Sequence, residues 1–417
     1  MRMFTRETFV ALRNRNFRLF FGGQLISQAG NWLTLVALSL FVLKLTDSGV
    51  AVGVLTGCMF APVLLFGAFG GLIADRSDKR KLLIGVQTFA MIQSFALAMV
   101  ATMDDPPLAL IYGLAAAGGF VLAFENPARR AFVNEMVPEK DLNNAISLNS
   151  AVMTASRVVG PAIAGLLIGT VGYAWCFALD GISYIAVIIA YIRMNPELLR
   201  RAPVTERGKG QIRAGLRYVR TVPELWISIL MLAVIGTLSF NFQTVMPLLI
   251  KRTFDGTDQT FTWFFSIVSI GSLVGALATA RRSVGGLRNL AVTSMGFGIS
   301  MLALSIAPSL WLTFPIGIAI GYTSIGFMVA GTAIVQLRAD PAMRGRVLAL
   351  QAIVFLGSTP IGGPILGVIC EAFGPRTGVA VGGIAAVGAA AFGVVAARRT
   401  RDIEGDVALE TRQLEVA

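Results

Sequence analysis

Long apolar stretches separated by short polar segments run along the whole chain. Twelve of them are long enough to cross a bilayer, at 17–43, 50–73, 82–102, 108–128, 147–170, 174–192, 225–249, 261–280, 289–307, 310–335, 347–369 and 378–397. A helix needs roughly 20 apolar residues for this, and a segment in lipid must satisfy its backbone hydrogen bonds internally. The pattern predicts an all-α polytopic membrane protein with twelve transmembrane helices.

Composition and charge agree with this prediction. Hydrophobic residues make up 55% of the sequence and charged residues 14%, against about 25% charged in soluble proteins. Of 35 Lys and Arg residues, 30 fall in the segments on one side of the spans and four on the other, the remaining one being Arg157. The positive-inside rule then places both termini in the cytoplasm, in a plasma (inner) membrane. We attribute the net charge of +12 to the orientation of the protein in the membrane and to contact of its basic segments with anionic lipid. Nucleic acid is therefore not an expected partner.

Several kinds of site are not expected. Cys58, Cys176 and Cys370 lie in or beside spans without metal-ligand spacing, which favours a packing role. The chain has no histidine, so a proton relay must use carboxylates. No nucleophile–base set, phosphate loop or cofactor motif is present. We therefore predict neither an enzyme, a metal site nor a cofactor, and a monomer suffices for this architecture.

The sequences of the two halves are similar at an offset of 203 residues, which aligns Gly160 and Pro161 with Gly363 and Pro364. Proline removes a backbone donor and kinks a helix, so both pairs are predicted helix kinks, either bistable or merely shaping a static helix. Two six-helix pseudo-repeats are typical of parallel-repeat secondary transporters. The predicted parts are a first half, a cytoplasmic linker, a second half and a cytoplasmic tail, at 1–192, 193–224, 225–397 and 398–417.

The segment between the second and third spans carries a recognisable motif, Gly-Leu-Ile-Ala-Asp-Arg-Ser-Asp-Lys-Arg-Lys at 71–81. Gly71 would permit close helix approach. Asp75, at a helix end, can face the positive N-terminus of a neighbouring helix. Arg76 and Arg80 complete the motif. A charged turn that merely obeys the positive-inside rule is the alternative.

This motif resembles that of the major facilitator superfamily. Stretches at 126–132, 157–165 and 344–347 resemble its drug:proton antiporter-3 branch, which includes enterobactin-exporter-like and macrolide-efflux-like proteins. The resemblance covers nearly the whole chain. It implies a major facilitator fold in which Asp75 meets the eleventh span near Arg346 and latches the outward-facing state. Gly160 and Pro161 resemble the antiporter motif, which implies export.

Three charges lie within the predicted spans, where ionisable groups are expensive and usually mark pathways. They are Glu125, Arg157 and Asp180. One hypothesis is that Glu125 or Asp180 takes up a proton while Arg157 pairs alternately with a carboxylate or with substrate. The alternatives are a static pair between Arg157 and Asp180, and a pair between Glu125 and Arg129 one helical turn away.

The predicted substrate cavity is apolar and aromatic with few polar groups, which favours a small amphipathic substrate. Its candidate lining residues are Gln24, Asn31, Trp32, Asn241, Gln243 and Tyr322. Hydrogen bonding between helices is the alternative role for the amides. Relatives often carry an acid where Asn31 stands, and Asn31 cannot titrate, so facilitated diffusion or another coupling route stays open.

Together these features predict export of an amphipathic organic compound, a drug-like molecule or a siderophore, by proton antiport and alternating access. Translocation of a lipid or lysolipid is an alternative, distinguished by lateral entry of substrate from the bilayer. A non-transporting membrane receptor or scaffold is another, although the short tails offer no signalling domain.

Overall fold

The computed structural model describes residues 9–200, 211–280 and 286–416, the last as backbone alone beyond residue 397. Within these residues, twelve helical segments are long and apolar enough to cross a membrane, and no strand is present. The fold prediction is thus confirmed. The part of the predicted linker at 201–210 lies outside the described residues.

Eleven of the twelve segments are single helices. In chain order these are α2 (Arg15–Thr46), α3 (Gly49–Arg76), α4 (Lys79–Val100), α5 (Leu108–Met136), α6 (Glu139–Thr170), α7 (Tyr173–Ile192), α11 (Asp258–Ala280), α12 (Leu287–Ser305), α13 (Leu310–Arg338), α14 (Pro341–Phe373) and α15 (Pro375–Val416). The seventh segment is divided into α9 (Pro223–Leu238), α10 (Phe242–Leu248) and a π-helical turn at Leu249–Thr253. Shorter helices are η1 (Val10–Arg13), η2 (Pro196–Leu198) and α8 (Gln211–Thr221).

Polar residues fix several helix ends. The Ser48 hydroxyl accepts from the Ala51 backbone N–H and caps α3, and Asp78 caps α4 by accepting from Lys81. Gly172 and Gly374 have φ of 90° and 86° and form the turns before α7 and α15. Such positive φ values favour glycine.

Several helices extend beyond the predicted spans, among them α6, α14 and α15, and polar contacts accompany two of the differences. The segment α5 continues to Met136, beyond the predicted end at residue 128, because polar side chains at its end have partners inside the protein. Lys79 Nζ lies 2.7 Å from Glu135 Oε1, and both side chains are buried. The predicted linker also contains a helix, α8, and the Tyr218 hydroxyl accepts from the Asp340 backbone N–H, which ties α8 to the start of α14.

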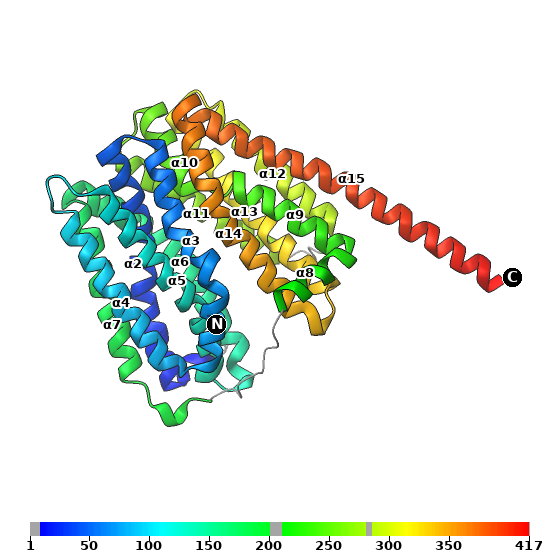
Figure 1. Cartoon of the computed structure of the whole chain (residues 1–417), viewed down its shortest axis with the longest axis horizontal. Helices are drawn as coiled ribbons and strands as arrows, with labels where there is room; N and C mark the ends of the chain where they lie inside the picture. The colour runs from blue at the N-terminus through cyan, green and yellow to red at the C-terminus, as the bar shows by residue number, and fades with distance from the viewer. Residues whose placement is uncertain (1–8, 201–210, 281–285, 417) are drawn as a thin grey trace, which may run out of the picture.

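Helices α2–α7 form one bundle, the first half, and α9–α15 form a second, the second half (Figure 1). In the first half α2 packs on α6 and α7, α3 on α5, and α4 on α5 and α7. The second half repeats these pairings, with α9 on α14 and α15, α11 on α13, and α12 on α13 and α15. The internal repeat in the sequence is therefore repeated in the helix packing.

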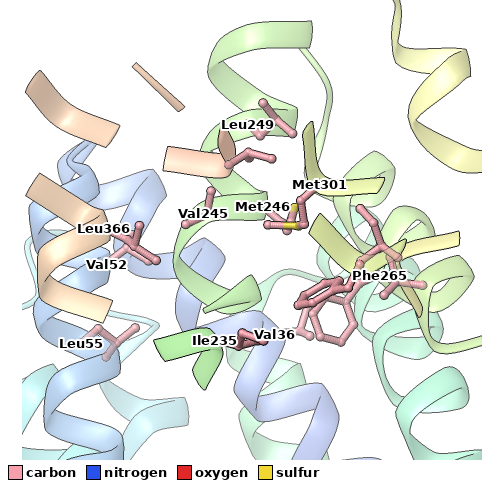
Figure 2. Packing of buried hydrophobic residues seen from close by; sticks show 14 of the residues in the cluster. Val36, Val52, Leu55, Ile235, Val245, Met246, Leu249, Phe265, Met301 and Leu366 are labelled. Atoms are coloured by element: carbon pink, nitrogen blue, oxygen red, sulfur yellow. The ribbon is translucent and has the colours of Figure 1, made fainter. Parts of the chain in front are cut away.

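The two halves join along two helix pairs, α3 with α14 and α6 with α11. Glycines allow the first pair to approach closely: a Cβ at Gly53 would lie 2.7 Å from the Gly363 carbonyl oxygen and 3.0 Å from Pro364 Cα. One apolar cluster crosses this junction and includes Val52 of α3 and Leu366 of α14 (Figure 2). We call the bundle end near this junction, with the turns at 47–48, 171–172, 254–257 and 374, the closed end.

The opposite end, with the turns at 77–78, 137–138 and 339–340, is called here the basic end. Towards it the helices of the two halves diverge (Figure 1). A Cβ at Gly71 or Gly345 would meet nothing within 4 Å, and one at Gly67 only Val63 of its own helix. At Gly357 of α14, nearer the closed end, an added Cβ would meet Leu64 of α3. This conformation is thus closed at one end and open at the basic end.

The α3–α14 junction generates the first prediction. Because backbone atoms of α14 surround Gly53, we expect Gly53→Ala to separate the helices and lower the melting temperature by several degrees, through overpacking that costs about 1–3 kcal/mol. Gly85→Ala is the matched control: its Cβ would meet nothing within 4 Å, so better helix propensity should preserve or raise stability. Thermal unfolding in lipid nanodiscs measures both, and equal melting temperatures would contradict this account of the junction.

Candidate functional site

Ion pairs and hydrogen bonds bridge the two halves at the closed end. Arg252 Nε lies 3.2 Å from Asp47 Oδ1 of the first half, and Arg252 Nη1 lies 3.2 Å from Glu371 Oε2 of the second. The same Glu371 oxygen accepts from the Gly49 backbone N–H at 2.6 Å. Arg252 and Glu371 thus hold the α2–α3 turn of the first half against the second half.

A second bridge lies on the other side of the closed end. The Tyr173 hydroxyl of α7 donates to Asp258 Oδ2 of α11, and Lys251 Nζ lies 2.7 Å from the other carboxylate oxygen. Deeper in the junction, the hydroxyls of Thr56 and Thr244 are 2.9 Å apart. Polar contacts therefore close this end from its rim inwards.

Two of the predicted latch residues, Arg80 and Arg346, have partners on their own side of the junction in this conformation. Arg80 donates to the carbonyl oxygens of Tyr191 and Ile192 at 2.6 and 2.8 Å, which satisfies the C-terminal carbonyls of α7. Arg76 is exposed, and no ion pair joins Asp75 to Arg346. The Arg346 guanidinium lies 3.2 Å from Met343 Sδ, and its Cβ faces Gly215 of α8.

The close approach of helices predicted at Gly71 occurs at its neighbour Gly70. A Cβ at Gly71 would lie in open space, whereas one at Gly70 would collide with the Ala123 carbonyl oxygen of α5. The expectation for Gly71 is therefore wrong in this conformation, because Gly71 faces away from α5 where Gly70 meets it.

Glu125 lies inside the first half in a buried polar cluster. Its Oε1 is 3.7 Å from Arg129 Nε, and both side chains are at most 4% exposed. Arg129 also donates to Gln24 Oε1 and Asn126 Oδ1 at 3.2 and 3.1 Å. The same Gln24 oxygen accepts from Gln28, and the Gln24 amide donates to the Tyr191 hydroxyl. Gln24 thus hydrogen-bonds within the first half rather than lining an open cavity.

Asp180 forms a second buried group nearby. Its Oδ2 accepts from the hydroxyls of Thr34 on α2 and Ser94 on α4, at 2.7 and 3.1 Å. Its Oδ1 is buried without a hydrogen-bond partner and faces Gly30, where a Cβ would lie 2.5 Å away. On the same helix the Tyr184 hydroxyl donates to Asn31 Oδ1 at 2.7 Å, so Asn31 also bonds between helices.

Arg157 is separate from these carboxylates. Its guanidinium carbon lies 5.4 Å from the centre of the Trp32 ring, and its side chain is exposed. The Trp32 ring in turn lies 6.1 Å from the Phe265 ring of the second half. The static pair between Arg157 and Asp180 is not formed, because Thr34 and Ser94 bind Asp180 while Arg157 stacks on Trp32 at the junction of the halves.

The two Gly-Pro pairs occupy different junctions. Gly160 lies against α2, where a Cβ would come 2.5 Å from Trp32 Cβ, so this pair packs within the first half. Gly363 and Pro364 instead lie against Gly53 of the other half. Both α6 and α14 continue as helices through Pro161 and Pro364.

The predicted cavity residues of the second half take several positions. Asn241 is buried at the break between α9 and α10, where its amide donates to the Thr237 carbonyl at 2.7 Å and so satisfies the interrupted backbone. Gln243 is partly exposed at the start of α10. Tyr322 lies on an exposed stripe of α13 together with Trp311 and Ile318. An apolar stripe of this kind is typical of a surface that faces lipid.

Possible metal ligands are dispersed. Within the described residues, no group of three or more His, Cys, Asp or Glu side chains is placed to hold a metal ion.

Comparison with known proteins decides the family. The family model described as "Transmembrane secretion effector" matches residues 6–413. The chain belongs to this transporter family, a branch of the major facilitator superfamily. The resemblance in the sequence motifs is therefore confirmed, and the protein is an integral membrane transporter rather than an enzyme.

Several relatives match most of the chain. The staphyloferrin A transporter of Staphylococcus aureus is 23% identical over 86% of this chain and 90% of its own length. Macrolide efflux protein A of Streptococcus pyogenes is 24% identical over 83% and 87%. The enterobactin exporter EntS of Escherichia coli O1:K1 / APEC is 23% identical over 84% of each chain.

Solved structures share the fold. A bacterial homolog of the human lysosomal transporter Spinster, in an inward-facing and unoccupied conformation, aligns with a TM-score of 0.70 over 92% of this chain and 96% of that chain, at 15% identity. The nucleoside transporter NupG aligns with a TM-score of 0.74 over 92% of this chain and 100% of that chain, at 14% identity.

Sequence reasoning missed one group of residues and left another as an alternative. The closed-end bridges were not predicted, although Lys251 and Arg252 stood out as two of only four cations on their side of the spans. The alternative pair between Glu125 and Arg129 is formed. Arg129 lay just beyond the predicted span, and it is buried beside Glu125 because α5 extends past it. Its position one helical turn after a buried acid was the available signal.

The closed-end bridges generate the second prediction. We expect Arg252→Gln to open the closed end, because each exposed ion pair contributes up to about 1 kcal/mol, equivalent to about a fivefold shift in population. A cysteine at Thr56, in a variant without the three native cysteines, should react about fivefold faster with a membrane-impermeant thiol reagent. Arg376→Gln is the control, because Arg376 donates to the Ser305 and Ala307 carbonyls within the second half. Equal labelling rates in all three proteins would contradict the bridging role.

Proposed function

We propose that this protein exports a small amphipathic organic compound, a drug-like molecule or a siderophore, by alternating access. The single observation that carries the proposal is the conformation: two repeated bundles joined at one end and open at the other. The names of relatives, which transport or export siderophores and macrolides, support the direction and the substrate class.

The proposal places the basic end and both termini in the cytoplasm, following the distribution of Lys and Arg. With this orientation the described conformation is inward-facing, ready to accept substrate from the cytoplasm. Substrate release requires the bridges around Arg252 to break and the basic end to close.

Flux through proteoliposomes tests export. The purified protein, reconstituted with its basic end outside, should move enterobactin or a macrolide, the compounds named for two relatives, into the vesicle lumen. Uptake should exceed that of protein-free liposomes and should increase when the lumen is acidic. Folded protein that binds such a compound and moves none would contradict the proposal.

We propose that Glu125 couples export to proton movement. Its carboxylate is buried beside Arg129 on the same helix, and Arg129 donates to Gln24 of α2. Protonation of Glu125 would weaken the ion pair that holds Arg129 and so would disturb this link between α5 and α2. A change in charge at such a site can shift a two-state equilibrium. Asp180, held by Thr34 and Ser94, is the second candidate for the same role.

We expect Glu125→Gln to abolish stimulation of flux by a proton gradient while leaving substrate binding within about twofold, because a neutral amide preserves shape but cannot titrate. Glu135→Gln is the matched control: it removes another buried carboxylate of α5, the one paired with Lys79, and should reduce stability while retaining the gradient response. Gradient-driven flux at the wild-type rate in Glu125→Gln would assign coupling to another group.

The proposed inner latch is Asp75 against the N-terminus of α14 near Arg346, formed only when the basic end closes. Asp75→Asn removes the charge that would favour this contact, so the outward-open population should fall about twofold to fivefold. Labelling of a cysteine at Thr56 should slow accordingly, the opposite of the effect expected for Arg252→Gln. Glu197→Gln, an exposed acid at the basic end, is the control. An unchanged labelling rate in Asp75→Asn would contradict the proposed latch.

A further inference from the structure

A polar stripe on α6 leads from the basic end to Arg157. Asn143, Ser147, Ser150, Thr154 and Arg157 recur at spacings of four, three, four and three residues, which places them on one helix face. All are exposed or partly exposed, and the three hydroxyls between Asn143 and Arg157 donate to carbonyl oxygens of their own helix. The charged Arg157 at the end of this stripe is unfavourable against lipid, where its guanidinium would lack partners.

The contacts of α6 show where this face points. Gly160 packs against Trp32 of α2 in the first half, while Gly165 packs against Thr262 of α11 in the second. At roughly 100° per residue, the stripe lies between the directions of these two contacts. It therefore faces the space between the halves, which is open towards the basic end.

Arg157 is the last exposed residue of the stripe. The next residues on this face, Pro161 and Ala164, are buried. The Trp32 ring lies beside the guanidinium, and the Phe265 ring of the second half lies 6.1 Å from the Trp32 ring. Arg157 thus lies at the inner end of the opening, with apolar surface next to it.

The Arg157 guanidinium has no acidic partner. The carboxylates buried in the neighbouring helices are engaged elsewhere, Glu125 with Arg129 and Asp180 with Thr34 and Ser94. No described carboxylate lies within ion-pair distance of Arg157, and its contact is the face of Trp32. A guanidinium at the end of an apolar-walled opening is suited to bind a planar oxyanion through two hydrogen bonds.

We propose that Arg157 is the binding site for the anionic group of the substrate, and that the substrate is an amphipathic organic anion whose apolar body lies against Trp32 and Phe265. This assignment rests on the proposed export function and names the charge class of its substrate. The corresponding position of the second half, 203 residues further on, is Pro360, so only the first half supplies this cation.

Two xanthene dyes of opposite charge test the proposal: fluorescein, an anion, and tetramethylrhodamine methyl ester, a cation. Binding is measured by fluorescence anisotropy with the full-length protein in phosphatidylcholine nanodiscs. Wild type should bind fluorescein more tightly than the cationic dye. Arg157→Gln should weaken fluorescein binding about tenfold or more, and Arg157→Lys should retain part of the affinity because it keeps the charge.

Arg220→Gln is the matched control. Arg220 also stacks on a tryptophan, Trp226, at 5.5 Å, but it belongs to α8 outside the opening. This variant should bind both dyes as wild type does. Size-exclusion profiles and thermal unfolding establish that each variant is folded.

Three results would overturn the anion site: equal fluorescein affinity in wild type and Arg157→Gln, preference of wild type for the cationic dye, or binding of neither dye by wild type. These outcomes are separable from failure of the export proposal. Binding of fluorescein in nanodiscs without flux in proteoliposomes would contradict export and leave the anion site intact. Flux in proteoliposomes with tighter binding of the cationic dye would support export and contradict the anion site.

Discussion

Hydrocarbon offers no hydrogen-bond partner, so every polar group at membrane depth must find one inside the protein or face water. In the first half, Arg129 lies beside Glu125 and donates to Gln24, and one Asp180 oxygen accepts from Thr34 and Ser94 while the other has no partner. Arg157 has no acidic partner among the described residues and faces the space between the halves. The same requirement explains Asn241, whose amide bonds to the carbonyls that the broken seventh segment leaves free. Polar side chains within the apolar helices thus mark the places where helices are hydrogen-bonded to one another or where water enters.

The two halves share their helix pairing but not their chemistry. Buried charges concentrate in the first half, whereas the second contributes a broken helix and an aromatic cluster around Phe240, Phe297 and Phe355. Glycines let α3 and α14 approach backbone to backbone at the closed end, and the bridges of Arg252 lie at its rim. In the proposed cycle these bridges oppose the latch of Asp75, so that only one end is closed at a time. Uptake of a proton by a buried carboxylate would shift the balance between the two.

The fold was predictable because its signals are long and redundant. Span length, the distribution of Lys and Arg, and the 203-residue repeat each pointed to the same plan. The site residues depend on which way each side chain points, and the sequence pattern predicts this less well than it predicts a span. Glu125, Arg157 and Asp180 stood out because charge within an apolar run is rare, but only the packing separates Arg157 from Asp180. Gly70 and Gly71 could not be distinguished without knowing which one faces α5. The bridges of Arg252 join residues more than 100 positions apart, and nothing in the local sequence encodes such a contact.

Distances between spin labels in the reconstituted protein test the central claim, that the halves pivot between opposite closed ends. One pair, at Ser77 and Ala342, reports on the basic end, and a second pair, at Thr170 and Thr257, reports on the closed end, each in a variant without native cysteines. The account predicts two distance populations for each pair, with the basic-end distance shortening under the conditions that lengthen the closed-end distance. A single unchanging distance at the basic end, or both ends opening together, would contradict it.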